Sequence, residues 1–379
     1  MSAPVPPALA ALAAARVVDG PPALVFDAAA IDARMAAGAA IARRHRARVL
    51  SAAKALPHPA LLALARPRLD GVDVAGAAEQ ALVGDGFGLV SLADPARARW
   101  RGAPPPELTI SCESVDDVRR ARAQAPTASI GLRLSISSLV PGDDAVGALA
   151  AGDGHRRSRF GVEVARPGGL ATLRAMIAAA AGAPVGVHAH GAGVVYTSPR
   201  AWGRLAAAVA ALLDEVALAP AFVDLGGGWH GVADELDASL AAVRQALPEV
   251  ELRLEPGRLW TLGAGFAVGH VRAARELDDR SLRVVSLSRL CHLRWSPVRL
   301  LAPPPPPGTG RKVMLVGPTC FEDDDVGQWT LGPGPDGGAP LAVGQPVVLA
   351  DVVGYALAWN TGFAGVAPAE VVVLDGDRR

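Results

Sequence analysis

The chain has 379 residues, more than one ordinary domain usually needs, so two domains are expected. Hydrophobic residues make up 51% and charged residues 20%, which allows a large core and argues against disorder as the main state. Lys+Arg and Asp+Glu both number 37, so the formal net charge is +0. This balance provides no global positive field that would hold nucleic acid or an anionic membrane.

Cysteine usage and the N-terminus both favour a soluble cytoplasmic protein. Cys112, Cys291 and Cys320 lie far apart and form no CxxC pair, which disfavours a zinc or redox motif and fits a reducing compartment. The apolar N-terminal stretch has no basic region before it, contains prolines and reaches Arg16 early. A signal peptide or a membrane span is therefore not expected there.

Short apolar runs alternate with amphipathic, alanine-rich segments in the first two thirds of the chain. The expected strands are residues 23–26, 48–53, 71–75, 107–112, 129–135, 184–190, 221–225 and 251–255. The expected helices run from 27 to about 44, 115 to about 125, 170 to about 181, 199 to about 213 and 232 to about 247. Asp27 and Ser198 are suitable N-caps, and Pro199 suits the first helical position. Repeated strand–helix units favour an α/β fold, either a parallel (β/α)₈ barrel or a doubly wound sheet.

The last third changes character at about residue 266. Its apolar runs are rich in β-branched residues and fall at 283–288, 312–316, 345–353 and 370–374. Turn-rich stretches at 303–307 and 332–340 separate them, which is typical of a compact all-β domain. We expect a barrel domain over 22–265 and a C-terminal β-domain over 266–379, with residues 1–21 packing on the second.

Unusual polar residues follow the expected strands of the barrel. Such positions converge on one mouth of a (β/α)₈ barrel. They are Lys54, Arg133, His188, His190, Gly226–Gly228, Glu255, Gly257 and Arg258. Each alone has an ordinary explanation, because loop lysines are usually solvated, strand-end histidines are usually structural, and a sharp turn needs glycine anyway. Together they favour a functional site.

The chemistry of this set is that of pyridoxal 5′-phosphate (PLP). Glycines at a strand end let backbone N–H groups approach a phosphate, and an arginine adds charge. A buried lysine can lose its proton and form an imine with an aldehyde cofactor. A glutamate can hold a pyridine nitrogen protonated, which makes the ring an electron sink.

Eight motifs, taken in order, resemble those of the fold-type III PLP-dependent decarboxylases, the group of ornithine, arginine and diaminopimelate decarboxylases. They are SAAKALPHP (51–59), GVDVAGAAE (71–79), SRFGV (158–162), VHAHGAG (187–193), DLGGGW (224–229), EPGR (255–258), VGPTC (316–320) and GYALAWNTGFAG (354–365). The resemblance runs from about Pro22 to about Gly365. It implies an alanine racemase-like (β/α)₈ barrel plus a β-domain, PLP as cofactor, and a homodimer with shared active sites.

The resemblance also implies roles for individual residues. Lys54 would be the Schiff-base lysine, His190 would stack on the pyridine ring, and Glu255 would pair with the pyridine nitrogen. Cys320 would reach into the partner subunit's site. The remaining cofactor contacts implied are Asp73, Arg133, Gly226, Gly227, Gly228, Gly257, Arg258 and Tyr355.

Departures from the family pattern indicate a changed substrate. Leu56 stands where asparagine is usual, and Gly193 replaces a serine. Phe321 occupies the place of the acidic residue that receives the distal ammonium of the substrate. The acidic run 322–325 after it is either a solvated loop or a shifted contact. The expected substrate-binding residues are Arg294, Phe321, Glu322 and Asp324.

The expected reaction is decarboxylation of an amino acid or amino-acid-derived intermediate, with specialised-metabolite or siderophore biosynthesis as a suggested setting. It would proceed through an aldimine on Lys54 and a quinonoid, with His190 on the ring and Cys320 of the partner subunit as proton donor. A racemase or epimerase on the same scaffold is one alternative. A non-catalytic decarboxylase-like regulator is another, against which the retained Lys54, triple glycine, Glu255 and Cys320 argue. No metal is expected.

Overall fold

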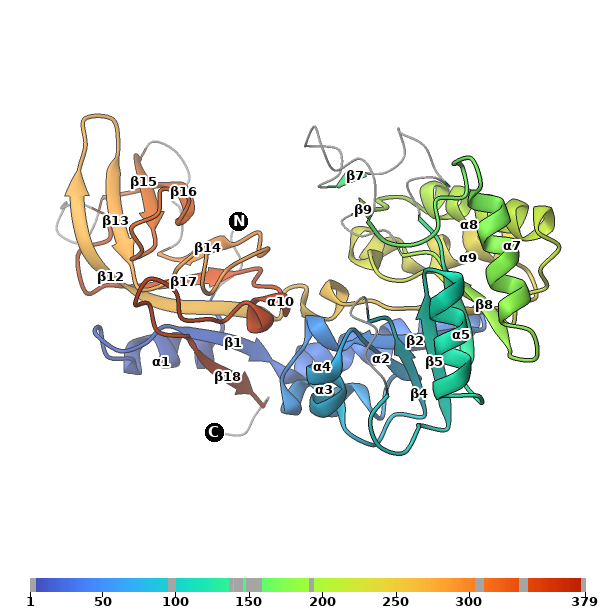
Figure 1. The fold of residues 1–379 in the computed structure, drawn as a ribbon. Helices are drawn as coiled ribbons and strands as arrows, with labels where there is room; N and C mark the ends of the chain where they lie inside the picture. The colour runs from blue at the N-terminus through green and yellow to red at the C-terminus, as the bar shows by residue number, and fades with distance from the viewer. Residues whose placement is uncertain are drawn as a thin grey trace. The chain divides into compact units, whose positions relative to one another are not determined.

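The computed structural model describes residues 5–94, 100–135, 139, 146–147, 159–190, 194–303, 310–333 and 340–375. The chain divides into two compact units (Figure 1). The barrel unit comprises Asp32–Lys54 and Leu62–Leu259, and the β unit comprises Met1–Ile31, Ala55–Leu61 and Trp260–Arg379. Residues 22–31 thus fall in the β unit, whereas the sequence analysis placed them in the barrel domain.

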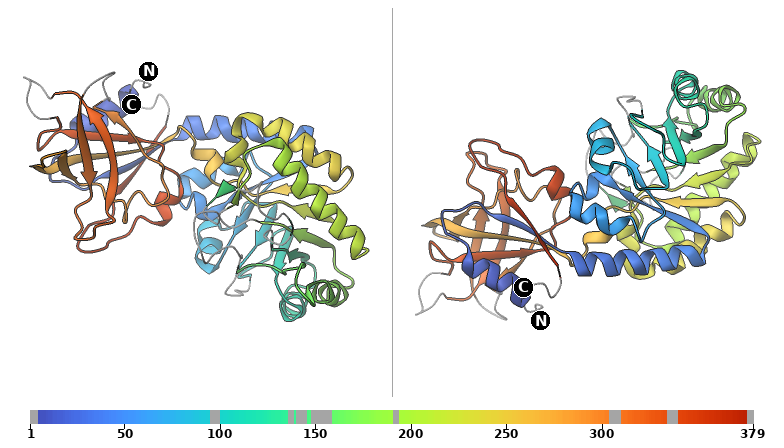
Figure 2. Two further views of the ribbon diagram at one scale, coloured as in Figure 1. Left: turned by 90° about the horizontal axis from the view of Figure 1, so that it is seen from above. Right: turned by 90° about the horizontal axis from the view of Figure 1, so that it is seen from below.

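The barrel unit contains a closed, all-parallel barrel of eight strands in the order β10-β11-β2-β3-β4-β5-β6-β8 (Figure 2). The strands are β2 (Ala47–Ala52), β3 (Gly71–Val74), β4 (Leu89–Leu92), β5 (Glu107–Cys112), β6 (Ser129–Arg133), β8 (Val185–His188), β10 (Phe222–Asp224) and β11 (Glu251–Leu254). This confirms the expected barrel and excludes the doubly wound sheet. A small pair, β7 (Val146–Gly147) with β9 (Val194–Val195), lies outside it.

Helices alternate with the strands of the barrel. α2 (Ala28–Arg44) precedes β2, and later helices are α3 (Pro59–Ala65), α4 (Ala77–Val83), α5 (Val115–Gln124), α7 (Gly169–Ala179), α8 (Pro199–Glu215) and α9 (Leu236–Ala246). Both expected caps are present: Asp27 Oδ1 accepts from the Ala30 N–H at 2.9 Å, and Ser198 Oγ accepts from the Ala201 N–H at 3.2 Å. The expected helix start at Val232 was wrong, because a 3₁₀ segment, η2 (Trp229–Glu235), precedes α9.

Two strand predictions differ from the structure. Residues 23–26 were expected to open the barrel, but β1 (Ala23–Asp27) pairs with β12 and β18 of the β unit. Conversely, β4 was not expected, because its four residues stand between glycine- and proline-rich turns and are too short for a visible pattern.

Side chains pack inside the barrel below the C-terminal ends of its strands. Phe222 of β10 lies beside two glycines of neighbouring strands, Gly131 and Gly186. The Arg253 guanidinium lies 3.8 Å from the centroid of the Phe222 ring and donates to Thr109 Oγ1 at 2.7 Å. These contacts close the barrel beneath the C-terminal strand ends.

The β unit is built on one mostly antiparallel sheet, which confirms the expected all-β domain. Its path is β14-β17-β12-β13-β15-β16, with β1 between β12 and β18. The strands are β12 (Gly265–Glu276), β13 (Ser281–Val285), β14 (Arg299–Ala302), β15 (Arg311–Val316), β16 (Asp325–Leu331), β17 (Pro346–Ala350) and β18 (Glu370–Leu374). Leu9 and Ala13 of α1 (Pro7–Ala15) pack on this sheet against Val25 and Val348. Among the helices that the structure describes, none is long and apolar enough to cross a membrane.

Candidate active site

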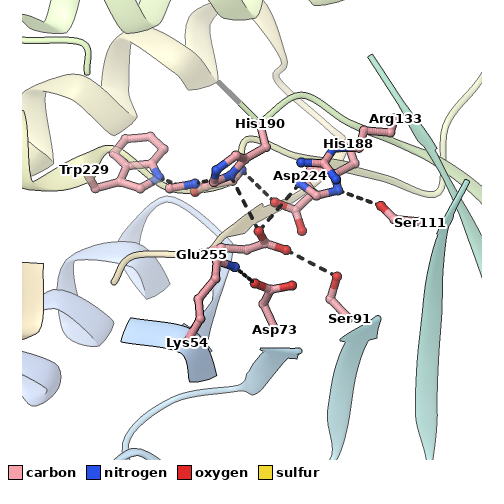
Figure 3. A network of polar contacts seen from close by, with 12 residues as sticks. Lys54, Asp73, Ser91, Ser111, Arg133, His188, His190, Asp224, Trp229 and Glu255 are labelled. Carbon is pink, nitrogen blue, oxygen red and sulfur yellow. Dashed lines mark hydrogen bonds and ion pairs between the residues drawn. The ribbon is translucent and has the colours of Figure 1, made fainter. Parts of the chain in front are cut away.

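Polar side chains from six barrel strands gather at the C-terminal mouth of the barrel (Figure 3). Lys54 follows β2 in a single 3₁₀ turn, η1 (Ala53–Ala55), and Glu255 follows β11. The strands supply Asp73, Ser91, Ser111, Arg133, His188 and Asp224. His190 and Gly226–Gly228 come from the loops after β8 and β10. Of the residues that the sequence analysis selected from the barrel, the structure thus brings together Lys54, Arg133, His188, His190, Gly226–Gly228 and Glu255.

Lys54 forms an ion pair with Asp73. The Asp73 side chain is fully buried, whereas the lysine side chain is 32% exposed. Asp73 Oδ1 has no hydrogen-bond partner among the described residues. A buried carboxylate therefore holds the amine of Lys54 at the mouth, where a small molecule can reach it.

Glu255 is 2% exposed, and its carboxylate oxygens face a serine hydroxyl and two imidazoles. Ser91 Oγ donates to Oε1 at 3.2 Å, and His188 Nε2 lies 3.6 Å from Oε2. Burial raises the pKa of Glu255 well above its usual value, and the nearby carboxylates of Asp224 and Asp73 raise it further. Burial also raises the pKa of Asp224 to about 6. The site is therefore arranged to gain from a cation placed beside these carboxylates.

Both histidines of the mouth are neutral at physiological pH. Burial lowers the pKa of His190 to about 3, and the nearby cations Lys54 and Arg133 lower it further. Burial likewise lowers the pKa of His188 well below 6.5. Their contacts with Glu255 are therefore polar contacts of neutral imidazoles, not ion pairs.

The triple glycine holds His190 in place. Gly226 has φ 62°, and a Cβ there would lie 2.2 Å from His190 Nδ1. The Gly227 N–H donates to the same nitrogen at 2.9 Å. Trp229 Nε1 donates to Gly226 O at 2.9 Å, and its ring stacks on Trp202 at 3.7 Å. Only glycine fits this close approach of backbone and imidazole.

Arg133 enters the mouth from β6. Its guanidinium pairs with Glu113 at 3.3 Å and lies 4.4 Å from the centroid of the Phe160 ring. Gly257 is buried, and Arg258 is half-buried at the start of η3 (Arg258–Thr261). Ser158 of the SRFGV motif and Gly193 lie outside the described residues.

The other predicted site residues belong to the β unit. Cys320, Phe321 and Glu322 are exposed, and the Phe321 ring lies 5.1 Å from that of Phe363. Tyr355 opens the short helix α10 (Tyr355–Ala358). The exposed guanidinium of Arg294 lies 4.2 Å from the centroid of the Trp359 ring.

Asp324 is not placed as a substrate contact would be. Its carboxylate is buried and accepts hydrogen bonds from Ser288 Oγ at 2.9 Å, the Arg289 N–H at 2.6 Å and Thr319 Oγ1 at 2.7 Å. These bonds tie two loops of the β unit together. Of the two carboxylates expected to contact a substrate, Glu322 is exposed and Asp324 is buried.

Ser91, Ser111 and Asp224 were not predicted from the sequence. Asp224 ends a recognised strand directly before the glycines, so its position carried a signal. Ser111 shares the inward face of β5 with Thr109 by the alternation of a strand, which a barrel assignment would have supported. Ser91 could not be found, because β4 itself was not recognised.

His188, His190 and Glu255 also form a group of potential metal ligands, since one ligand atom from each lies within 4.8 Å of the others. The Gly227 N–H already occupies the lone pair of His190 Nδ1, the nitrogen that faces Glu255. We therefore assign no metal to this group.

The comparisons with known proteins identify the fold. No family model and no curated protein matches the chain. Among solved structures, it is similar to arginine decarboxylase of Paramecium bursaria Chlorella virus bound to agmatine, with 17% identity, TM-score 0.72 and coverage of 94% of this chain and 98% of that one. It is also similar to lysine/ornithine decarboxylase of Vibrio vulnificus complexed with cadaverine, with 17% identity, TM-score 0.73 and coverage of 98% and 100%. A third is SrLDC in complex with PLP and cadaverine, with 17% identity, TM-score 0.69 and coverage of 99% and 95%. The chain therefore has the two-unit fold of the fold-type III PLP-dependent decarboxylases.

Proposed function

We propose that this protein is a PLP-dependent amino-acid decarboxylase. The observation that carries the proposal is the pairing of two features at one barrel mouth: the amine of Lys54 held by buried Asp73, and a buried carboxylate, Glu255, whose pKa is raised. An amine that can bind an aldehyde and a carboxylate that can bind a pyridinium are the two groups that PLP requires. The solved decarboxylases of the same fold support the same reading.

The residues of the mouth fit the cofactor. Asp73 Oδ1, beside the amine of Lys54, is a buried polar atom that has no hydrogen-bond partner among the described residues. The absence of a Cβ at Gly226 and Gly227 leaves room for the His190 imidazole at the mouth. The residues that would hold PLP are Lys54, Asp73, Arg133, His190, Gly226, Gly227, Gly228, Glu255, Gly257, Arg258 and Tyr355.

When bound, PLP supplies an aldehyde carbon that takes the substrate amine and a ring that accepts the electron pair left by departing CO₂. Asp73 orients the amine of Lys54 and holds a proton on it or takes one from it. Glu255 would hold the proton on the pyridine nitrogen. Neutral His190 would face the ring without adding a charge that would compete with that proton. The packed barrel interior below excludes water from this end of the site.

Cys320 of the partner subunit is proposed to protonate Cα, which requires a homodimer with shared active sites. Cys320 is the exposed cysteine, whereas Cys112 and Cys291 are buried. Burial raises the pKa of the Cys112 thiol to about 12, so that thiol is a poor proton carrier. In D₂O, the wild type should place deuterium on one face of Cα. Cys320→Ala should slow turnover and lose that facial selectivity, whereas unchanged selectivity would remove Cys320 from this role.

The substrate is proposed to differ from ornithine or lysine at its distal end. Apolar Phe321 stands where the family has an acidic contact, and Asp324 is engaged within the β unit. Arg294, Phe321 and Glu322 remain the proposed substrate contacts. An amino-acid-derived intermediate of specialised-metabolite or siderophore biosynthesis would suit such a set.

CO₂ release tests the proposed function. The purified protein with PLP is screened against single enantiomers of basic, acidic and neutral amino acids and their side-chain derivatives, with Lys54→Ala as the control. The proposal expects CO₂ from at least one substrate and none with the variant. Loss of chirality without CO₂ would instead indicate a racemase. Failure of the protein to bind PLP at all would leave a non-catalytic relative of the fold.

A further inference from the structure

Three side chains behind Glu255 have no role in the function proposed so far. Figure 3 shows Ser91, Ser111 and His188 to the right of the Glu255 carboxylate, on the side away from Lys54 and Trp229. Ser91 Oγ donates to Oε1, and His188 faces Oε2. Ser91, His188 and Glu255 are each at most 3% exposed. Polar groups so deeply buried are normally hydrogen-bonded, so their arrangement bears on the charge of Glu255.

The contact between Ser111 and His188 sets which ring nitrogen of His188 carries the proton. Ser111 Oγ lies 2.6 Å from His188 Nδ1. If the hydroxyl donates to Nδ1, the proton of the neutral ring is on Nε2 and points at Glu255. If Nδ1 donates to the hydroxyl, the lone pair of Nε2 faces the carboxylate instead. Only the first arrangement is attractive towards an ionised Glu255.

His190 cannot donate a hydrogen bond to Glu255 in place of His188. Its Nδ1, the nitrogen that lies 3.8 Å from Glu255 Oε2, already accepts the Gly227 N–H. His188 Nε2 has no hydrogen-bond partner among the described residues and lies 3.6 Å from Oε2. That distance is longer than a hydrogen bond, as catalytic contacts often are before the ligand binds. A proton on His188 Nε2 would therefore have Glu255 as its acceptor.

The carboxylate needs such donors, because its surroundings oppose its charge. Two neighbouring carboxylates, Asp224 and Asp73, and burial all disfavour the anion, whereas Lys54 and Arg133 favour it. If Glu255 kept the proton, the pyridine nitrogen would be left neutral and would withdraw electrons poorly. Donors to both carboxylate oxygens favour the anion and thus leave the proton on the ring.

We infer that Ser111 and His188 are positioning residues for the proposed PLP site: Ser111 fixes the proton of His188 on Nε2, and that proton, with the Ser91 hydroxyl, holds Glu255 ionised so that the pyridine nitrogen remains protonated. This inference rests on the proposed function. It assigns to this chain a Ser–His–Glu series, half-buried at Ser111 and buried at His188 and Glu255, that acts on the cofactor only through Glu255.

The test uses holoenzyme loaded with PLP that is ¹⁵N-labelled at the ring nitrogen. The ¹⁵N chemical shift reports protonation of that nitrogen in the resting protein, without turnover. We expect His188→Phe and Ser111→Ala to lower the pH at which the nitrogen loses its proton by about one to two pH units, a tenfold to hundredfold weaker hold, because one charge-assisted hydrogen bond is lost. His188→Gln, whose amide can place an N–H near the position of Nε2, and Ser111→Thr, which keeps the hydroxyl, should stay close to the wild type.

Ser239→Ala is the control, because Ser239 is a fully buried serine of α9 in the same unit. It should leave the ¹⁵N shift unchanged. Should the His188 variants fail to fold, as judged by far-UV circular dichroism, the comparison of Ser111→Ala with Ser111→Thr decides. A nitrogen that stays protonated in Ser111→Ala over the same pH range as in the wild type would overturn the inference while leaving the proposed function intact. Wild-type protein that binds no PLP would overturn the proposed function itself.

Discussion

The substitution Gly226→Ala tests the close approach between the triple glycine and His190. The added Cβ would lie 2.2 Å from His190 Nδ1 and 2.7 Å from His190 Cβ, so the imidazole must move. The backbone φ of 62° adds strain, because a left-handed conformation costs a residue with a Cβ about 1–2 kcal/mol. Displacing a packed side chain costs about 1–3 kcal/mol more. The barrel should therefore lose about 2–5 kcal/mol of its free energy of unfolding.

Gly168→Ala is a matched control for this prediction. Gly168 precedes α7 in the left-handed conformation, with φ 83° and ψ -9°, and nothing lies within 4 Å of its hypothetical Cβ. The control should thus suffer the left-handed strain alone, about 1–2 kcal/mol. Urea unfolding of the PLP-free proteins, followed by circular dichroism, measures both losses. PLP titration followed by absorbance should show weakened binding for Gly226→Ala and unchanged binding for Gly168→Ala.

The clash with His190 is the term that separates the two variants. Equal losses of stability, or equal PLP affinities, would refute the argument that Gly226 is required by the imidazole. In that event the left-handed backbone alone would explain the glycine.

Three further predictions concern the barrel interior, a buried carboxylate and the exposed thiol. A Cβ at Gly186 would lie 2.6 Å from the Phe222 ring, whereas the nearest atom to a Cβ at Gly131 is at 3.5 Å. Urea unfolding should therefore show that Gly186→Ala loses about 1–3 kcal/mol of its free energy of unfolding and that Gly131→Ala loses much less. Equal losses would contradict this packing. The pKa of Asp224 rises from 3.8 to about 6 on folding, so the native state holds its proton more tightly and stability falls as the pH rises from 3.8 towards 6. Asp224→Asn should accordingly be more stable than the PLP-free wild type at pH 7.5, by up to ~3 kcal/mol, and the advantage should shrink at pH 4; a constant difference would disprove the assignment. One thiol per chain should react rapidly with Ellman's reagent, and Cys320→Ser should remove it, because that cysteine alone of the three is exposed.

The fold could be predicted where local pattern and tertiary structure agree. Apolar runs predict seven of the barrel strands to within a few residues of their observed bounds. Capping chemistry predicts the N-caps Asp27 and Ser198. β1 could not be placed, because its partner β18 lies at the opposite end of the chain, and a buried strand has the same apolar run in a barrel as in an antiparallel sheet.

The residues of the candidate site could likewise be predicted only in part. Lys54, Glu255 and the histidines could be found because polar residues at the ends of parallel strands share one mouth. Ser91 could not, because a serine inside a short strand has no distinguishing pattern. The burial of Asp324 could not be predicted, because it depends on donors from a segment distant in sequence, Ser288 and Arg289.

The most direct test of the central claim is to locate the lysine that binds PLP. The chain has two lysines, Lys54 at the barrel mouth and exposed Lys312 on β15. The protein is incubated with PLP, reduced with borohydride and digested, and the modified peptide is identified by mass spectrometry. The account predicts a phosphopyridoxyl group on Lys54 and loss of the visible imine band in Lys54→Ala but not in Lys312→Ala. Modification of Lys312 alone, or of neither lysine, would contradict it.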